Sequence, residues 1–358
     1  MTLSRTSDAL LALTRLGAGN VGGILPDNIK WTELKALAEQ HGLSAIVLDG
    51  IERLPESKRP PQVFLLEWIG EVLQNYEYLY EQYVKAIMEL AGFYNRHGYK
   101  MMVLKGYACS LDWPKPEHRP CGDIDIWQFG KQKEVDSLLG KEKGVEIDSS
   151  HHHHTVFYWR DFMVENHYDF INVHHHRSHV ELEAILKELG QDDSQSVELY
   201  GEKVYLPSAN LHALFLLKHL TLHFSTGEIN LRQLLDWAFF VRAHGKDVDW
   251  ERTENVIEQF GMKEIYGIFN AICVEELGFV PNIFNFVQYN PFLKQRAVED
   301  IMRVTPANEV PMNMFRRVFY KYHRWKANEW KHELCYRDSM WSAFWSGVWN
   351  HLLKPSSI

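Results

Sequence analysis

The sequence predicts an α+β fold in which a small mixed sheet with its own helices is flanked by helical segments. Three observations along the chain lead to this prediction. Apolar residues follow helical spacing up to residue 98, short apolar or alternating runs typical of strands occupy residues 99–207, and helical spacing returns from residue 208 onward. We therefore expect three domains, at residues 1–98, 99–207 and 208–358.

The first segment is expected to contain helices only. Helical patterns cover residues 31–41, 43–54 and about 60–96. The third of these is long, begins at two consecutive prolines, and repeats apolar side chains such as Trp68 every three or four residues. Gly98 marks its end, because glycine commonly follows the last turn of a helix.

The central segment combines short strands and helices. Strands are expected at residues 101–104, 123–127, 155–159 and 162–167, with a hairpin at 197–206. Helices are expected at residues 107–113, 131–143 and 181–189. The third and fourth strands are joined at Arg160 and Asp161, and the hairpin turns at Gly201. This order indicates a mixed α/β block between the two helical segments.

The last segment returns to helices. They are expected at residues 208–224, 229–243, 249–260, 263–277, 291–303 and 312–352. In the final helix Trp341, Trp345 and Trp349 recur every four residues and form one aromatic face. We expect this Trp-rich face to dock on the domain or on a partner, such as a second copy of the chain. Binding to a membrane surface or stacking on nucleic-acid bases are the alternatives.

Composition limits the classes of function. The chain has 358 residues, 46% of them hydrophobic, and a formal net charge of -9, which argues against a nucleic-acid partner. The four cysteines contain no CxxC pair, so free thiols and a cytoplasmic location are expected. No run of about 18 apolar residues occurs, so no membrane span is expected.

Two aspartates on one predicted strand are the first candidate functional residues. Asp123 and Asp125 lie two positions apart, so their side chains project from the same face, while Ile124 and Ile126 point into the core. Two carboxylates this close repel each other, and a divalent cation would relieve the repulsion. Oxygen ligands of this kind suit Mg²⁺ or Mn²⁺. A solvent-exposed strand face is the alternative interpretation.

Neighbouring residues strengthen the metal interpretation. The first predicted strand ends at Lys105 and Gly106, where backbone N–H groups can meet a phosphate. Glu165, on a later strand, would complete a two-metal site. Individually, Gly106 is also typical of a plain turn and Glu165 of a half-exposed strand position. The order of these features along the chain favours the functional interpretation.

These residues resemble a known family. The stretch Val103-Leu104-Lys105-Gly106, followed by Arg119-Pro120-Cys121-Gly122-Asp123-Ile124-Asp125-Ile126, resembles the uncharacterised nucleotidyltransferases of the polymerase-β-like superfamily. Val164-Glu165-Asn166-His167 is similar to the family's third motif, an acidic residue two positions before a histidine. Leu231-Arg232-Gln233-Leu234-Leu235-Asp236 resembles a helix motif of the same proteins. The resemblance covers about residues 80–245.

The resemblance implies a polymerase-β-like nucleotidyltransferase core and a two-metal reaction. A nucleoside monophosphate would pass from a nucleoside triphosphate, with ATP the expected donor, to a hydroxyl of a small-molecule or protein acceptor. Asp123 and Asp125 would hold the metal on the phosphates, and Asp125 and Glu165 a second metal. Glu165 acting as general base is the alternative.

The resemblance also implies residues that contact the substrates. Lys105, Gly106, Arg119 and Gly122 would bind the nucleotide, although surface solvation explains the two basic side chains equally well. His167 shares a strand face with Glu165 and would lie beside the substrate. Asp236 would support the site, an ion pair with Arg232 within one helix being the alternative. 

Departures from the family pattern leave other functions open. The superfamily's usual Gly-Ser turn is here Lys105-Gly106-Tyr107, and the gap from Gly106 to Asp123 is long. A nucleotide-binding or protein-interaction module with little catalysis is therefore the second hypothesis. The histidine runs at 151–154 and 174–176 suggest a third, a metallohydrolase, but neither run has the HExxH spacing.

Overall fold

The computed structural model describes residues 3–174, 176–303, 323 and 325–342. It confirms the α+β fold and divides the chain into two compact units. One, the helical unit, comprises residues 1–59, 217–241 and 250–340; the other, the sheet unit, comprises residues 60–216, 242–249 and 341–358. This division groups segments in space, whereas the three expected domains follow the order of the chain, and their boundaries stay a prediction.

The helical unit combines the N-terminal helices with helices from the second half of the chain. Its elements are α1 (Arg5–Gly17), α2 (Trp31–Gln40), α3 (Ser44–Glu52), η1 (Glu56–Lys58), the last turns of α9 (Ala209–Thr226), most of α10 (Leu231–His244), α11 (Trp250–Gln259), α12 (Lys263–Glu275), η4 (Pro281–Ile283), α13 (Pro291–Met302) and α15 (Glu329–Cys335). Arg15 Nε donates to the carbonyl of Glu276 at 2.6 Å, and Asn20 Nδ2 donates to that of Leu277 at 2.8 Å. These bonds link the N-terminal helices to the end of α12.

The expected helix at 312–352 is wrong as one continuous element. α15 ends at Cys335, and Tyr336 has extended backbone angles of φ −140° and ψ 141°. The break buries Tyr336, whose hydroxyl hydrogen-bonds with Ser225 at 2.9 Å and whose ring lies 4.1 Å from Lys218 Nζ. Of the expected tryptophan face only Trp341 lies within the described residues; Trp345 and Trp349 lie outside them.

The sheet unit contains six strands where the sequence predicts them. They are β1 (Met102–Val103), β2 (Ile124–Trp127), β3 (His154–Trp159), β4 (Phe162–His167), β5 (Ser196–Leu199) and β6 (Glu202–Tyr205). Their order in the sheet is β3-β4-β2-β1-β6-β5. β2 is parallel to β4 and β1 to β6, and the other neighbours are antiparallel, so the sheet is mixed.

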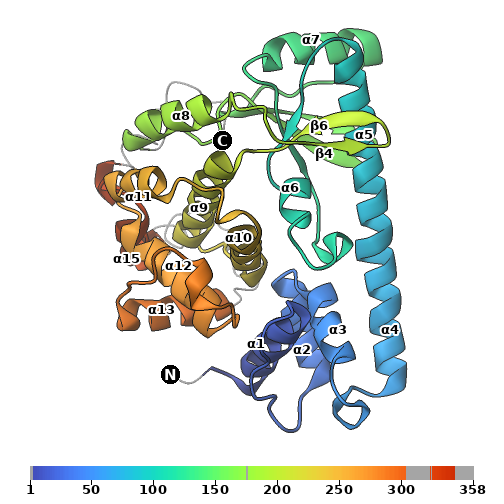
Figure 1. The fold of residues 1–358 in the computed structure, drawn as a ribbon, viewed down its shortest axis with the longest axis vertical. Helices are drawn as coiled ribbons and strands as arrows, with labels where there is room; N and C mark the ends of the chain where they lie inside the picture. Colours follow the sequence, from blue (N-terminus) through green and yellow to red (C-terminus); the bar gives the residue numbers. More distant parts are fainter. Residues whose placement is uncertain (1–2, 175, 304–322, 324, 343–358) are drawn as a thin grey trace. The chain divides into compact units, whose positions relative to one another are not determined.

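The sheet unit also contains helices. They are α4 (Gln62–Val72), the π-helix η2 (Leu73–Tyr78), α5 (Leu79–Arg96), α6 (Tyr107–Ser110), η3 (Pro116–His118), α7 (Gln132–Lys143), α8 (Ser178–Leu189) and the first turns of α9. α4, η2 and α5 follow one another as a single long rod, which confirms the predicted long helix (Figure 1). None of the helices in the described ranges is long and apolar enough to cross a membrane.

One face of the sheet forms the core of this unit. Ile124 and Ile126 of β2 and Val164 of β4 are fully buried in a cluster with α5 and α7. On the same side, Asp136 of α7 accepts hydrogen bonds of 2.8 Å from Thr155 and from Asn166. Because side chains alternate along a strand, the neighbouring residues of β2 and β4 must project from the opposite face.

A buried glutamate holds the segment that follows β4. Glu183 of α8 is 4% exposed, and its two carboxylate oxygens accept the backbone N–H groups of Phe170 and Ile171, each at 3.0 Å. This bond pair fixes the chain three residues after His167. One side chain of α8 therefore anchors the backbone just after β4.

We predict that Glu183→Ala lowers the free energy of unfolding by about 3 kcal/mol, because it leaves two buried N–H groups without an acceptor. Urea unfolding followed by circular dichroism measures the change. Glu181→Ala is the matched control, since Glu181 is exposed on the same helix and its loss should change stability by less than about 0.5 kcal/mol. Equal effects of the two substitutions would contradict the assigned role.

Candidate functional site

The strand register brings acidic and histidine side chains together on the second face of the sheet. Asp125 of β2 pairs with Glu165 of β4, and His154 of β3 pairs with His167 of β4. Directly paired residues project to the same side, and Glu165 and His167 are two apart on one strand. All four side chains therefore share one face. The expected position of Glu165 beside the Asp125 strand is confirmed.

Asp125 is the most buried carboxylate of this group. It is 2% exposed, and its Oδ1 accepts hydrogen bonds from Lys105 Nζ at 2.8 Å and from His167 Nε2 at 3.0 Å. Burial alone would raise the pKa of Asp125, but the Lys105 ammonium and the His167 hydrogen bond hold it well below its usual range. Asp125 is therefore ionised, with two cationic groups beside it.

His167 is held as a cation by its surroundings. Its Nδ1 lies 3.2 Å from the carbonyl of Asp169, and its Nε2 lies 3.0 Å from Asp125 Oδ1 and 3.5 Å from Glu165 Oε2. Carbonyl and carboxylate oxygens only accept hydrogen bonds, so both ring nitrogens carry protons. Burial would lower the pKa of His167, but the bonds to Asp125 and Glu165 raise it to about 9.

Glu165 and Asp123 respond differently to the same neighbourhood. Burial would raise the pKa of Glu165, but the hydrogen bond from His167 outweighs it and the pKa is lowered. For Asp123 burial and the charge of Asp125 act in the same direction and raise the pKa. Asp123 lies just before β2 and is partly exposed, and its carbonyl accepts the Tyr83 hydroxyl at 2.9 Å.

Gly106 has a packing role that the sequence did not show. It follows Lys105 with φ +47° and ψ −99°, a conformation that favours glycine. A Cβ atom at this position would overlap the hydroxyl of Tyr83, the same group that holds the Asp123 carbonyl. Loss of nucleotide binding in a Gly106 variant would therefore not, alone, locate a phosphate at this turn.

For the remaining predicted residues the structure gives the local surroundings. Arg119 is 5% exposed, and its Nη1 donates to the carbonyl of Pro120 at 3.1 Å, so it supports the loop before β2. Gly122 is exposed, and a Cβ atom there would meet nothing within 4 Å. Asp236 lies on α10 in the helical unit. Nucleotide contact by Arg119 and Gly122, and support from Asp236, stay predictions.

The donor atoms present fit a divalent cation. Asp125, Glu165 and His167 each place one donor atom within 4.8 Å of the other two. Carboxylate oxygens are the ligands that Mg²⁺ and Mn²⁺ prefer, and Asp123 adds a third carboxylate at the edge of this group. The Lys105 ammonium already neutralises one of the two negative charges of Asp125 and Glu165, so a bound cation would have to neutralise only the other.

Sequence reasoning missed two features of this face. The first is the Lys105–Asp125 ion pair, since Lys105 was assigned to the nucleotide. The second is the position of His154 opposite His167. The predicted turn at Arg160–Asp161 contained this information, because an antiparallel pair that begins with Trp159 opposite Phe162 brings position 154 opposite position 167.

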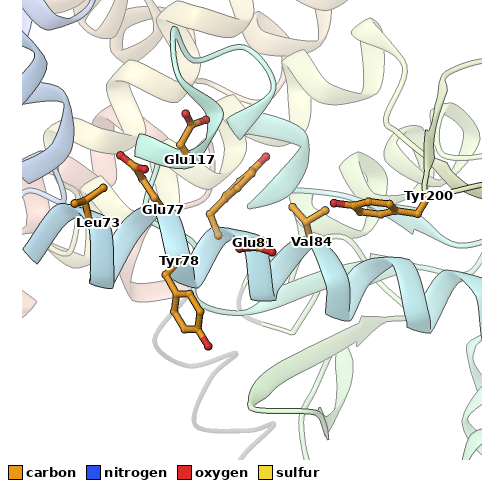
Figure 2. Close-up of a pocket in the computed structure, with 8 residues that line it drawn as sticks. Leu73, Glu77, Tyr78, Glu81, Val84, Glu117 and Tyr200 are labelled. Atoms are coloured by element: carbon orange, nitrogen blue, oxygen red, sulfur yellow. The ribbon is translucent and has the colours of Figure 1, made fainter. Parts of the chain in front are cut away.

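A groove of about 490 Å³ lies along the long helix of the sheet unit, and none of the candidate site residues lines it (Figure 2). Its walls come from η2, α5 and η3 and from the β5–β6 turn. They are acidic and aromatic, with Leu73, Glu77, Tyr78, Tyr80, Glu81, Val84, Glu117 and Tyr200 lining the space. Tyr80 also hydrogen-bonds with Ser110 of α6 at 3.0 Å.

We predict that Gly106→Ala lowers the free energy of unfolding by about 2 kcal/mol or more, through backbone strain and overlap with the Tyr83 hydroxyl. Thermal or urea unfolding gives the value. Adding Tyr83→Phe should restore part of the loss, because it removes the overlapping atom. Gly122→Ala is the control and should change stability by less than about 0.5 kcal/mol. No recovery in the double variant would exclude the overlap.

We predict that Lys105→Met, measured with a chelator present, lowers the free energy of unfolding by about 3 kcal/mol, because it removes a cation from a buried carboxylate. Lys105→Met combined with Asp125→Asn should recover part of that loss. Lys100→Met is the control: the Lys100–Asp193 pair has side chains 49% and 42% exposed, so its loss should matter by less than about 1 kcal/mol. Similar losses in both single variants would refute the assignment.

Comparison with known proteins places the chain in a family. A profile of the uncharacterised nucleotidyltransferase family matches residues 27–278, well over half of the chain. No curated protein matches it. Among solved structures, an antigenic nucleotidyltransferase-like protein from Paracoccidioides brasiliensis shares 14% identity at a TM-score of 0.33, over 49% of this chain and 87% of that chain. The family match confirms the resemblance found in the sequence: the chain belongs to the family of uncharacterised nucleotidyltransferases.

Proposed function

We propose that the chain transfers a nucleoside monophosphate from a nucleoside triphosphate, with ATP the expected donor, to a hydroxyl of a small-molecule or protein acceptor. The observation that supports this most directly is the pairing of Asp125 with Glu165 on parallel strands, with Asp123 two positions earlier. Two carboxylates are thereby adjacent on the sheet, and a third, that of Asp123, lies in the residue just before β2. This is the ligand set that metal-assisted phosphoryl transfer requires.

Asp123, Asp125 and Glu165 are the proposed ligands for Mg²⁺ or Mn²⁺. When bound, such ions would neutralise charge on the phosphates and lower the barrier to attack by the acceptor hydroxyl. The lowered pKa of Glu165 makes it a poor proton acceptor, which favours a ligand role over that of general base. The pKa of Asp123 is raised by burial and by the charge of Asp125, so a bound cation would stabilise the ionised form of this carboxylate.

Lys105 is the proposed source of fixed positive charge at this site. Its Nζ bonds Asp125 Oδ1, and the charges of Asp125, Asp123 and Glu165 all raise its pKa against the effect of burial. Lys105 is therefore charged, and its side chain, which contacts Asp125, is 17% exposed to solvent. A triphosphate placed here would meet this ammonium directly, whereas Arg119 would first have to leave its loop contact.

A module with little catalysis is the alternative, and one observation favours it. Lys105 and His167 both bond Oδ1 of Asp125, so the protein's own cations already compensate this carboxylate. A domain that only binds a nucleotide, or another protein, could retain such a balanced site. The alternative and the transferase predict different results in a turnover assay.

We predict that pyrophosphate release from a panel of nucleoside triphosphates requires Mg²⁺ or Mn²⁺ and falls at least about 100-fold in Asp125→Asn and in Glu165→Gln. The loss follows from removing one negative ligand charge at unchanged side-chain volume. Asp161→Asn is the control, because Asp161 is exposed at the β3–β4 turn and should release pyrophosphate at the wild-type rate. Nucleotide binding without pyrophosphate release in the wild type would support the module instead.

A further inference from the structure

Three histidines converge beside the carboxylates. His153 and His154, at the start of β3, and His167 of β4 each place a ring nitrogen within 4.8 Å of the other two. Their ring centroids are 4.3 Å apart for His153 and His154, 5.6 Å for His153 and His167, and 5.3 Å for His154 and His167. The β3–β4 register produces this arrangement, because it sets His154 opposite His167.

Two nitrogens of this cluster are buried without a hydrogen-bond partner. They are Nδ1 of His153 and Nδ1 of His154, and His154 as a whole is only 7% exposed. The Glu165 carboxylate approaches His154 Nδ1 to 3.8 Å, which is too long for a hydrogen bond. A buried polar atom without a partner is unfavourable, so these nitrogens indicate a ligand that binds imidazole.

The donor type of this cluster suits metal coordination. The Nδ1 atoms of His153 and His154 are buried and make no hydrogen bond, so each can serve as a nitrogen ligand. Neutral imidazole is a common ligand of Zn²⁺ and related ions, whereas Mg²⁺ prefers oxygen.

We propose that His153, His154 and His167 form a binding site for a transition-metal ion of the Zn²⁺ class, with the Glu165 carboxylate as its fourth ligand. Three histidines and one carboxylate are a donor set that zinc accepts in tetrahedral sites. Glu165 Oε2 lies 3.5 Å from His167 Nε2 and 3.8 Å from His154 Nδ1, on the side of the cluster that faces Asp125. The inference does not depend on the proposed transfer activity.

This site is distinct in chemistry from the carboxylate site, although the two share His167 and Glu165. An ion on His167 Nε2 would replace the proton that this nitrogen now donates to Asp125. Zinc binding would therefore remove one of the two cationic hydrogen bonds on Asp125. The structure thus links the occupancy of an imidazole site to the charge balance of the neighbouring carboxylate.

The test is a titration of the full chain with Zn²⁺ alone, in a competition assay with a chromophoric chelator and with Mg²⁺ in large excess. We expect one tightly bound ion per chain that Mg²⁺ does not displace. His153→Ala and His154→Ala should each weaken binding at least about 10-fold. His153 is only half buried, so its variant should keep the fold, which near-ultraviolet circular dichroism checks. Co²⁺ in place of Zn²⁺ should give the visible bands of a tetrahedral site.

The matched control is His151→Ala, which belongs to the same histidine run but has a side chain 45% exposed, and it should leave zinc affinity unchanged. Zinc binding that survives in His153→Ala and His154→Ala, or that disappears in His151→Ala, would show adventitious surface binding and overturn the proposal. Asp123→Asn separates the two hypotheses: it should lose pyrophosphate release but keep zinc. If Asp123→Asn loses turnover but still binds zinc, the zinc proposal is supported independently of the transferase proposal.

Discussion

The buried charge of Asp125 is the constraint on which the arrangement of this site depends. An ionised carboxylate that is 2% exposed is unfavourable unless opposite charge and hydrogen bonds surround it. Lys105 and His167 provide both, and they come from the ends of two different strands, β1 and β4. The three central strands must therefore keep one fixed register. Gly106, which directly follows Lys105, adopts a positive φ angle, and the chain turns there against the hydroxyl of Tyr83.

The apolar face of the sheet fixes the polar face. Ile124, Ile126 and Val164 are completely buried, and a slip of one residue would expose them and bury the carboxylates among α5 and α7. A hydrogen bond on the same side also favours this register, because the Asn166 amide reaches Asp136 only in the observed strand pairing. Packing on the apolar face therefore specifies the same strand register that the contacts of Asp125 require on the polar face.

Much of this could be predicted from the sequence, and the rest depends on tertiary contacts. Alternation and turn residues predicted the strands, and with them the position of Glu165 beside Asp125. The Lys105 ion pair was missed because a lysine reaches several places from one strand end. The helix break at Tyr336 was missed because its cause lies in α9, more than a hundred residues away, where Ser225 and Lys218 receive the ring.

The two proposed metal sites would couple protons and metal ions at this face, because they share ligands. The bonds from Lys105 and His167 both fall on Oδ1 of Asp125. Mg²⁺ or Mn²⁺, which prefer oxygen ligands, would leave the ring protons of His167 in place. The proposed ion of the Zn²⁺ class would instead replace the His167 Nε2 proton, and Asp125 would lose one of these two hydrogen bonds. The same residue pair would thus distinguish two classes of metal: one that leaves the charge balance around Asp125 intact, and one that changes it.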